Sequence, residues 1–584
     1  MIKLLKNLGK REWLLALMCV LLIAVQVWLE LKMPDYMSKI TVLVQTEGSQ
    51  MSEILENGLY MMGCAFGSLI TAIIVGYLAT NVSASFSMKV RKKIFDKVEN
   101  LAMHEIKKFS TSSLITRTTN DITQIQMFVA MGLQLMIKVP IMAIWAITKI
   151  LNKSWQWSTI TAIAVVILLI FIGIIMIIVI PRFKKIQKLI DRLNGVTREN
   201  LTGIRVVRAF NAENYQEDKF EDVNTELTRM LLFNQKLFSA FSPVMYLIMH
   251  SLTLAIYFVG AYLIKEAGMA DKIVLFGDMV VFSSYAMQVI ISFLLLAMIF
   301  MMLPRAQVSA ERINEVIETE ISIKDGNINK DLSDKRGSVE FKGVFFKYPD
   351  GDDYLLKDIT FKANKGETVA FIGTTGSGKT SLINLIPRLY DVTKGEVLVD
   401  GINVKEYNQE FLHNKIGYVP QKAVIFNETV NANVAYGENG KGEISKEKIK
   451  KTIEVAQAKD FIEKMENQYE EQMASGGTNV SGGQKQRISI ARAIARDPEI
   501  YIFDDSFSAL DYKTDSVLRK ELNKYTKDAT TLIVAQRIGT IMNADKIIVL
   551  DEGKIAGIGK HKELLEKCEV YKQIALSQLS EDEI

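Results

Sequence analysis

Six long apolar runs in the first half of the 584-residue chain restrict its fold more than any other feature. A membrane-spanning helix needs about 20 apolar residues, and each run is close to that length. A chain of this size also exceeds what one hydrophobic core usually serves, so at least two domains are expected. The sequence therefore predicts an all-α transmembrane domain of six helices and a further, soluble domain. The six runs lie at residues 13–33, 59–78, 128–151, 158–180, 241–263 and 279–303.

The charges of the connections predict the orientation of these helices. The connections after the second and fourth runs are long and basic, whereas the first short connection, "QTEGSQMSEILEN", is acidic. Lys and Arg stay on the cytoplasmic side, so we expect the N-terminus, both long connections and the C-terminal half in the cytoplasm of a multi-pass cell-membrane protein. The N-terminal basic and apolar order resembles a signal peptide, but no small-residue cleavage site follows, which favours a retained span in the lipid bilayer.

Composition divides the chain into three parts. Residues 1–310 form the predicted transmembrane domain, with long helical extensions in the two basic connections, and residues 311–337 form a polar linker. From 338 to 584, strand-like and helix-like runs alternate, which predicts an α/β nucleotide-binding domain. The net charge of +4, without a basic stripe interleaved with aromatics, excludes nucleic acid as the expected partner. The three cysteines have neither disulfide-framework nor zinc-site spacing.

The segment "FIGTTGSGKTS" has the spacing of a phosphate-binding loop. It follows the strand-like "ETVAFI" and precedes the helix-like "SLINLI", the context that the motif requires, so a chance glycine-rich turn is disfavoured. Backbone N–H groups of such a loop close on the phosphates of ATP, the lysine reaches the terminal phosphate and the following threonine ligates Mg²⁺. The predicted nucleotide-binding residues here are Gly373, Thr374, Thr375, Gly376, Ser377, Gly378, Lys379, Thr380 and Ser381.

Three further motifs surround this loop in a fixed order. "FKYPDG" places Tyr348 where its ring can stack on adenine, and "VPQKAVIFNETV" carries Gln421, an amide able to touch both Mg²⁺ and an attacking water. "NVSGGQKQR" offers backbone donors before an apolar helix, through Ser481, Gly482, Gly483 and Gln484. Together these motifs resemble the ATP-binding cassette transporters of exporter type, in which membrane and ATPase domains are fused. The resemblance extends to "ENLTGIRVVRAFNAE" and "PRAQVSAERI", and so covers nearly the whole chain.

The resemblance implies a type I exporter fold and a paired assembly. In that family two cassettes pack head to tail, so that each ATP lies between the phosphate loop of one cassette and the signature sequence, here "VSGGQ", of the other. A chain with one cassette therefore needs a second half-transporter as its partner. The same resemblance places Asp511 among the nucleotide-binding residues.

Two residues depart from the pattern of the family. Asp504 matches the aspartate that holds Mg²⁺, but Asp505 stands where the family has glutamate, and Gln536 stands where it has histidine. Aspartate is shorter by one C–C bond, about 1.5 Å. A displacement of about 1 Å at a reacting centre can lower a rate roughly 100-fold. We therefore expect Asp505, Gln536 and Gln421 to form a hydrolysis-impaired site, with a heterodimer partner that carries glutamate and histidine. The alternative is that Asp505 and Gln536 are mild variants, and that the site still hydrolyses ATP through water-mediated contacts.

The substrate is sought among ionisable groups inside the membrane, because these are costly to bury and are often functional. The candidates are Glu30, Lys138 and His250. The structural alternatives are that Glu30 pairs with Lys32, that Lys138 extends to water and that His250 bonds a helix carbonyl. The expected function is ATP-driven export of amphipathic compounds of the multidrug type. Lipid export, peptide export and an ATP-gated protein that is not a pump are the alternatives.

Overall fold

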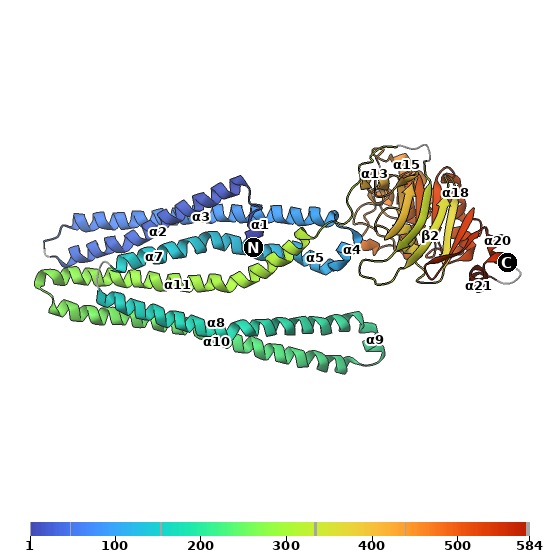
Figure 1. Ribbon diagram of the computed structural model, residues 1–584. Coiled ribbons are helices and arrows are strands. Elements are labelled where there is room, and N and C mark those ends of the chain that lie inside the picture. Colours follow the sequence, from blue (N-terminus) through green and yellow to red (C-terminus); the bar gives the residue numbers. More distant parts are fainter. Residues whose placement is uncertain (1, 47, 152–154, 332–335, 438–439, 580–584) are drawn as a thin grey trace. The chain divides into compact units, whose positions relative to one another are not determined.

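The computed structural model describes residues 2–46, 48–151, 155–331, 336–437 and 440–579, which fall into two compact units (Figure 1). The first, called here the helical unit, comprises Met1–Val98 and Thr111–Glu318. The second, the sheet unit, comprises Glu99–Ser110 and Thr319–Ile584. The short segment Glu99–Ser110 therefore belongs with the C-terminal unit although it lies within the N-terminal half of the sequence.

Among the described residues, the helical unit contains six helical stretches that are long and apolar enough to cross a membrane, as predicted. Helices α8 and α10 run side by side as a hairpin closed by α9, and α11 packs against α2, α7 and α10 (Figure 1). The helices are α1 (Ile2–Leu5), α2 (Lys10–Gln45), α3 (Met51–Glu99), α5 (Thr111–Thr118), α6 (Asn120–Met131), α7 (Ile137–Leu151), α8 (Trp155–Thr202), α9 (Ile204–Ala209), α10 (Glu213–Glu266) and α11 (Met269–Glu318).

A π-helical turn at Gly132–Met136 joins α6 to α7. Its position is explained by Pro140 within α7, which has no N–H for the carbonyl of Met136 and whose ring crowds that carbonyl. A widened turn that ends at Met136 accommodates both effects. The third predicted span is consequently an interrupted helix rather than a uniform one.

The sheet unit is built on two sheets. The smaller has the order β2-β1-β4-β5 and is antiparallel, and the larger has the order β10-β9-β3-β8-β7-β6, in which the five strands from β9 to β6 are parallel. The strands are β1 (Val339–Phe346), β2 (Leu356–Ala363), β3 (Thr368–Gly373), β4 (Lys394–Val399), β5 (Ile402–Asn403), β6 (Ile416–Val419), β7 (Ile500–Asp504), β8 (Thr530–Val534), β9 (Lys546–Asp551) and β10 (Lys554–Gly559).

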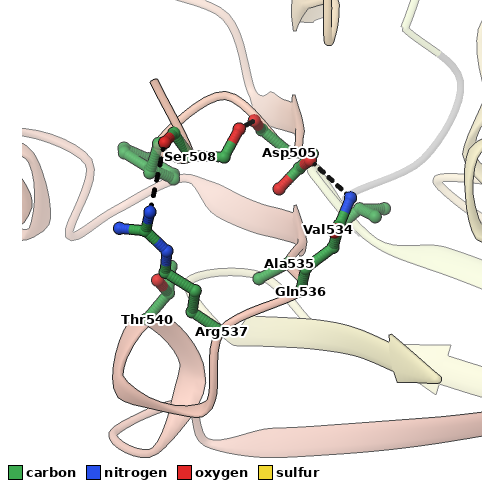
Figure 2. A pocket seen from close by; sticks show the side chains of 8 residues that line it. Asp505, Ser508, Val534, Ala535, Gln536, Arg537 and Thr540 are labelled. Carbon is green, nitrogen blue, oxygen red and sulfur yellow. Dashed lines mark hydrogen bonds between the residues drawn. The ribbon is translucent and has the colours of Figure 1, made fainter. Parts of the chain in front are cut away.

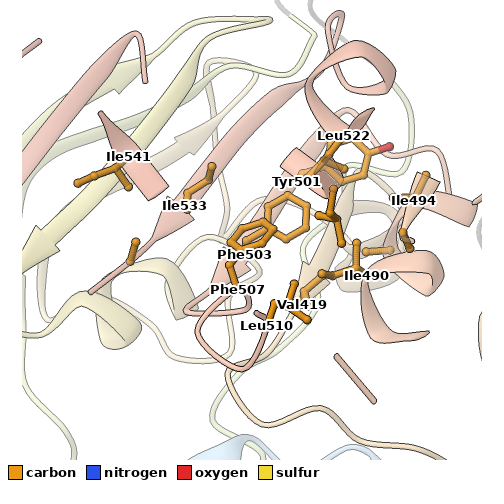
Figure 3. Packing of buried hydrophobic residues seen from close by; sticks show 14 of the residues in the cluster. Val419, Ile490, Ile494, Tyr501, Phe503, Phe507, Leu510, Leu522, Ile533 and Ile541 are labelled. Carbon is orange, nitrogen blue, oxygen red and sulfur yellow. The ribbon is translucent and has the colours of Figure 1, made fainter. Parts of the chain in front are cut away.

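Helices surround these sheets. They are α4 (Met103–Lys108), α12 (Lys379–Asn384), α13 (Gln409–Asn414), α14 (Val430–Val434), α15 (Lys446–Val455), α16 (Lys459–Ile462), α17 (Gly482–Ala495), α18 (Tyr512–Tyr525), α19 (Ile538–Ile541), α20 (His561–Lys567) and α21 (Glu569–Leu576). All five residues of β7 are buried, as expected for a central parallel strand covered on both faces. Tyr501 and Phe503 of β7 pack with Ile490 and Ile494 of α17 (Figure 3). This packing fixes the strand that ends in the two aspartates.

The predicted linker at residues 311–337 differs from the observed structure. Helix α11 continues to Glu318, because buried Ala306, Ala310, Ile313 and Val316 keep a helical apolar stripe beyond the membrane-spanning part. Further along, Gly326 N–H donates to the carbonyl of Tyr407 at 2.9 Å. Residues 311–318 therefore belong to the helical unit, and the described residues from Thr319 to Asp331 belong to the sheet unit. Residues 332–335 of the predicted linker lie outside the described residues.

Candidate nucleotide-binding and hydrolysis site

The larger sheet brings four functional loops to one edge. Strands β3, β8, β7 and β6 are adjacent and parallel, so their carboxyl ends lie together, where α/β sheets bind ligands. The phosphate loop follows β3, Gln536 follows β8, Asp505 follows β7 and Gln421 follows β6. Four motifs that are separated by up to 163 residues in sequence, from Gly373 to Gln536, are thus neighbours in the fold.

Glycine is required at two turns of the phosphate loop. Gly376 has φ +87° and Gly378 has φ +94°, in the left-handed region where a side chain is disfavoured. A Cβ at Gly378 would also lie 2.7 Å from Leu356 Cδ2. The tight loop keeps its backbone close to the space that phosphates would occupy, which is the property of a phosphate cradle.

Lys379 is held inside this loop. Its Nζ donates to the carbonyls of Gly373 and Thr374, each at 2.8 Å, and to Ser377 Oγ at 3.4 Å. Burial lowers the pKa of Lys379 below its usual value, and the nearby aspartates oppose this shift. A partly desolvated ammonium already positioned among loop carbonyls can bind a phosphate with little reorganisation.

Thr380 and Asp504, two of the predicted magnesium ligands, are in direct contact. Thr380 Oγ1 donates to Asp504 Oδ1 at 2.9 Å. Asp504 is 2 % exposed, and burial raises the pKa of its carboxyl above the usual range despite this hydrogen bond. A buried carboxylate, a hydroxyl and the Gln421 amide form a set of oxygen donors of the kind that Mg²⁺ prefers. The residues present therefore fit Mg²⁺, whose charge would compensate that of the buried carboxylate.

Asp505, Gln421 and Gln536 converge on a single oxygen. Gln536 Nε2 donates to Asp505 Oδ2 at 2.8 Å (Figure 2). Gln421 Nε2 donates to the same oxygen at 3.3 Å. Asp505 also has φ 47°, a left-handed conformation that aspartate tolerates better than most residues. Burial raises the pKa of Asp505, while the hydrogen bonds from Gln421 and Ser508 act against the rise. The three residues predicted for hydrolysis therefore form one cluster.

A small pocket lies beside this cluster (Figure 2). Arg537 Nη2 donates to the carbonyl of Ser508 at 3.4 Å on one side of the pocket. Arg537 was not predicted, although it directly follows Gln536 in the sequence. The pocket is lined by Asp505, Phe507, Ser508, Val534, Ala535, Gln536, Arg537 and Thr540.

Tyr348, the predicted adenine-stacking residue, is held by contacts with Ser381 and Tyr390. Its hydroxyl and Ser381 Oγ are 2.7 Å apart, and its ring meets Tyr390 edge-on at 5.2 Å between centroids. Lys107 Nζ lies 5.2 Å from the centroid of the Tyr348 ring. Neither Tyr390 nor Lys107 was predicted. Nothing in the sequence pointed to Lys107, which precedes Tyr348 by 241 residues.

The signature segment lies at the start of α17. Ser481 Oγ accepts from the Gln484 N–H at 3.3 Å, and Gln484 Oε1 accepts from the Ser481 N–H at 2.8 Å, so the two residues cap the helix. Gly482 and Gly483 form its first turn. In the part of the chain that the structure describes, no hydrogen bond joins this segment to the phosphate loop. The structure thus does not bring these two predicted groups of nucleotide ligands together.

Asp511 caps the following helix, α18. Its Oδ1 accepts from the Thr514 N–H at 3.0 Å, and this hydrogen bond lowers the pKa of the Asp511 carboxyl. The side chain is exposed. Its observed role is therefore helix capping, and its predicted contact with nucleotide stays a prediction.

Two of the three predicted substrate residues pair with each other. Glu30 Oε1 accepts from Lys138 Nζ at 2.8 Å, from Gln26 at 2.9 Å and from Ser68 at 3.1 Å. The alternatives that Glu30 pairs with Lys32 and that Lys138 extends to water are therefore wrong. Lys32 Nζ lies instead 5.8 Å from the centroid of the Trp28 ring.

His250, the third predicted substrate residue, stacks on another aromatic residue. Its ring lies 6.2 Å from that of Tyr246, and the two ring planes differ by 19°. This stacking joins residues one helical turn apart on α10. A contact of His250 with substrate stays a prediction.

Comparison with known families gives two matches along the chain. The profile of the ABC transporter transmembrane region matches residues 15–293, and a second profile, described as ABC transporter, matches residues 356–508. Together they cover most of the helical unit and the part of the nucleotide site from the phosphate loop to Asp505.

Individual relatives agree with these matches. An uncharacterised ABC transporter ATP-binding protein of Mycobacterium bovis is 37% identical over 526 residues, covering 90% of this chain and 89% of the relative. A Staphylococcus aureus ATP-binding/permease protein whose name proposes multidrug export is 33% identical over 511 residues, 85% of each chain.

A solved structure confirms the predicted fold. The structure of a bacterial Atm1-family ABC exporter with ATP bound superposes with a TM-score of 0.81, at 23% identity, over 98% of this chain and 100% of that one. The architecture is thus that of a type I exporter, with a helical transmembrane domain followed by a sheet-containing nucleotide-binding domain. With its transmembrane and ATP-binding regions joined in one polypeptide, this multi-pass chain belongs to the ABC transporter family as a half-transporter of exporter type.

Proposed function

We propose that this chain is one subunit of a heterodimeric exporter of amphipathic compounds, of the multidrug type, and that its own ATP site binds nucleotide but hydrolyses it poorly. On this proposal the N-terminus and the nucleotide-binding domain are cytoplasmic, in accord with the basic connections. Mg²⁺ is bound by Thr380, Asp504 and Gln421, and adenine stacks on Tyr348.

The convergence of two amides on Asp505 carries the proposal. Gln536 and Gln421 both donate to Oδ2, so the carboxylate oxygen that would accept a proton from water is already occupied by N–H donors. The short side chain adds a reach deficit of about 1.5 Å relative to glutamate. Burial raises the pKa of Asp505 and would by itself make it a stronger base. Position, rather than basicity, is therefore the expected cause of slow hydrolysis.

The residues that bind nucleotide have the arrangement that binding needs. Lys379 lies in the glycine-rich loop and can neutralise the terminal phosphate, and Thr380 and Asp504 present oxygen donors beside it. When bound, Mg²⁺ neutralises phosphate charge. The N–H groups of the phosphate loop orient the nucleotide. In this site the Asp505 carboxylate is held by the two glutamine amides and does not reach the attacking water.

Pairing with a different chain follows from a site that binds ATP but hydrolyses it poorly. The signature segment at Ser481 is intact and exposed, so it can complete a site on a partner. The proposed partner is a second half-transporter with glutamate and histidine at the positions of Asp505 and Gln536. The similarity to a protein named for multidrug export supports the proposed substrate class.

A substrate role for Glu30 and Lys138 requires that a charged substrate compete within their ion pair. A cationic compound would take the place of Lys138 at the Glu30 carboxylate. The joint change Glu30→Gln with Lys138→Met removes both charges and should lower transport of cationic dyes more than of neutral dyes. Equal effects on both dyes would assign the pair to structure alone.

ATP turnover and nucleotide-driven uptake into inverted vesicles test the function together. The chain is purified alone and with the partner that co-purifies, each in lipid. We expect low turnover alone, and turnover with uptake of amphipathic dye in the pair. Vigorous turnover by the single chain contradicts the impaired site, and turnover without uptake favours the ATP-gated protein that is not a pump.

A further inference from the structure

Lys107 lies over the aromatic pair at the predicted base-binding position. Its Nζ is 5.2 Å from the centroid of the Tyr348 ring and 5.8 Å from that of Tyr390, within the range of a cation–π contact. The lysine side chain is exposed, and Tyr348 is half-buried. An exposed cation over a half-buried ring lies on the face that solvent, and therefore a base, can reach.

A stacked base would need the same space. Stacked aromatic rings have centroids about 4.5–7 Å apart, and the Lys107 ammonium lies at this distance from Tyr348. One ring face cannot hold both a base and an ammonium. Two further aromatic rings crowd Tyr348, since Phe346 and Tyr390 lie nearly perpendicular to its ring at 5.0 and 5.2 Å between centroids. The Tyr348 hydroxyl is engaged by Ser381.

The segment that carries Lys107 has a second, independent attachment to the sheet unit. Glu105 Oε1 accepts from the Ser322 N–H at 2.8 Å, and its other oxygen accepts from the Ala102 N–H at 2.7 Å. Burial pulls the pKa of Glu105 upward, but these hydrogen bonds outweigh it and hold the pKa below the usual range. Glu105 can therefore keep the segment in place while Lys107 moves.

We propose that Lys107 competes with adenine for the Tyr348 ring, so that binding of the base at this site releases one of the contacts that hold the segment Glu99–Ser110. The inference rests on the proposed assignment of Tyr348 as the adenine-stacking residue. On this proposal a lysine from the N-terminal half of the sequence weakens nucleotide binding. A cation beside the phosphates would instead strengthen it.

Affinity for a non-hydrolysable ATP analogue, compared with inorganic tripolyphosphate, tests this inference on the assembled transporter. Lys107→Ala should tighten binding of the analogue about two- to five-fold, the effect of losing an exposed cation–π contact, and leave tripolyphosphate binding unchanged. Lys107→Arg should behave as wild type. Lys108→Ala, at the adjacent exposed lysine, is the matched control for net charge and should change neither affinity.

Tyr348→Ala distinguishes failure of the inference from failure of the assignment on which it rests. This change should weaken the analogue and not tripolyphosphate, and in its background Lys107→Ala should have no effect. Hydrogen exchange of residues 99–110 should also increase when the analogue is added to the wild type. If Tyr348→Ala weakens the analogue but Lys107→Ala weakens it too, or shifts tripolyphosphate equally, competition is refuted. If Tyr348→Ala leaves analogue binding unchanged, the assignment of Tyr348 and the inference both fail.

Discussion

The carboxylates of α2 and the two aspartates of the nucleotide site have different partners. In the helical unit Glu12, Glu30 and Asp35 each lie 2.6–2.8 Å from a lysine ammonium, in the pairs Glu12–Lys89, Glu30–Lys138 and Asp35–Lys149. In the sheet unit Asp504 and Asp505 receive hydrogen bonds from a hydroxyl and two amides, while Lys379 donates to loop oxygens. A carboxylate beside a lysine has its charge compensated within the protein, whereas one that accepts only neutral hydrogen bonds can bind a cationic ligand.

The largest effect should follow from breaking one of the internal pairs. Lys138→Met leaves the Glu30 carboxylate among Gln26 and Ser68 with no neutralising charge, which we expect to destabilise the protein by about 3–5 kcal/mol. The measurement is the unfolding midpoint of the purified protein in detergent. The double variant Glu30→Gln with Lys138→Met removes both charges and should recover most of the loss. A double variant as unstable as the single one would contradict a neutralising role for the pair.

A smaller effect, on binding rather than folding, is expected at the phosphate loop. Lys379→Ala should weaken nucleotide retention at this chain's site about 10- to 100-fold, because charged hydrogen bonds to phosphate are lost. Retention is measured in the assembled dimer with labelled ATP. Lys365→Ala, at an exposed lysine of the same unit, is the control. Unchanged retention in Lys379→Ala would show that Lys379 is not a phosphate ligand.

Substitutions of Asp505 and of Ser481, the serine of the signature segment, should differ in their effect on ATP turnover. Asp505→Asn should lower steady-state hydrolysis by the dimer less than about three-fold, since little turnover depends on this site. Ser481→Ala should lower it about ten-fold, the loss of one hydrogen bond to a charged ligand at the partner's competent site. Steady-state hydrolysis by dimers that carry either variant, compared with the wild-type dimer, is the measurement. The reverse order of the two effects would make Asp505 a working base despite its short side chain.

Asp505→Glu combined with Gln536→His sharpens the same test. The longer carboxylate restores reach, and the imidazole replaces one of the two amides on Oδ2. We expect added hydrolysis at this site in single-turnover experiments. If neither the double variant nor the two single changes alter hydrolysis, geometry at Asp505 is not what limits it.

The smallest effect concerns stability and pH. The pKa of Asp504 is raised in the folded state, so the stability that its protonated form contributes is present below the unfolded pKa and lost as pH rises through the folded pKa. Without nucleotide, Asp504→Asn should therefore raise the unfolding temperature of the sheet unit at pH 8 by a few degrees. The gain should shrink towards acidic pH. A constant difference across pH would exclude titration of Asp504 as its cause.

Local patterns were sufficient to predict much of this architecture. The six apolar runs predicted the spanning helices, and the glycine spacing around Lys379 predicted the phosphate loop, because each signal lies within one continuous segment. Strand order is not a local property. That Gln421, Asp505 and Gln536 share one oxygen depends on β7 lying between β6 and β8, which the sequence does not state.

The failures have the same origin. The structural alternative for Glu30 paired it with nearby Lys32, whereas helix packing supplies Lys138 from 108 residues away. The linker was predicted from the polar composition of residues 311–337, but Ile313 and Val316 continue the buried apolar stripe of α11. The contact of Lys107 with Tyr348 requires that a segment of the N-terminal half join the sheet unit, and no residue of that segment signals this.

The great length of α8, α10 and α11 has a mechanical consequence. At 48, 54 and 50 residues they extend about 70–80 Å, whereas the apolar core of a bilayer is about 30 Å thick. Each rod therefore acts as a lever whose outer arm is about 40 Å or more. A tilt of only about 5° about the membrane would carry its tip through about 3–4 Å, as far as one residue of extended chain. A small rotation of a helix within the membrane would therefore displace its far end by a distance comparable to that between neighbouring side chains.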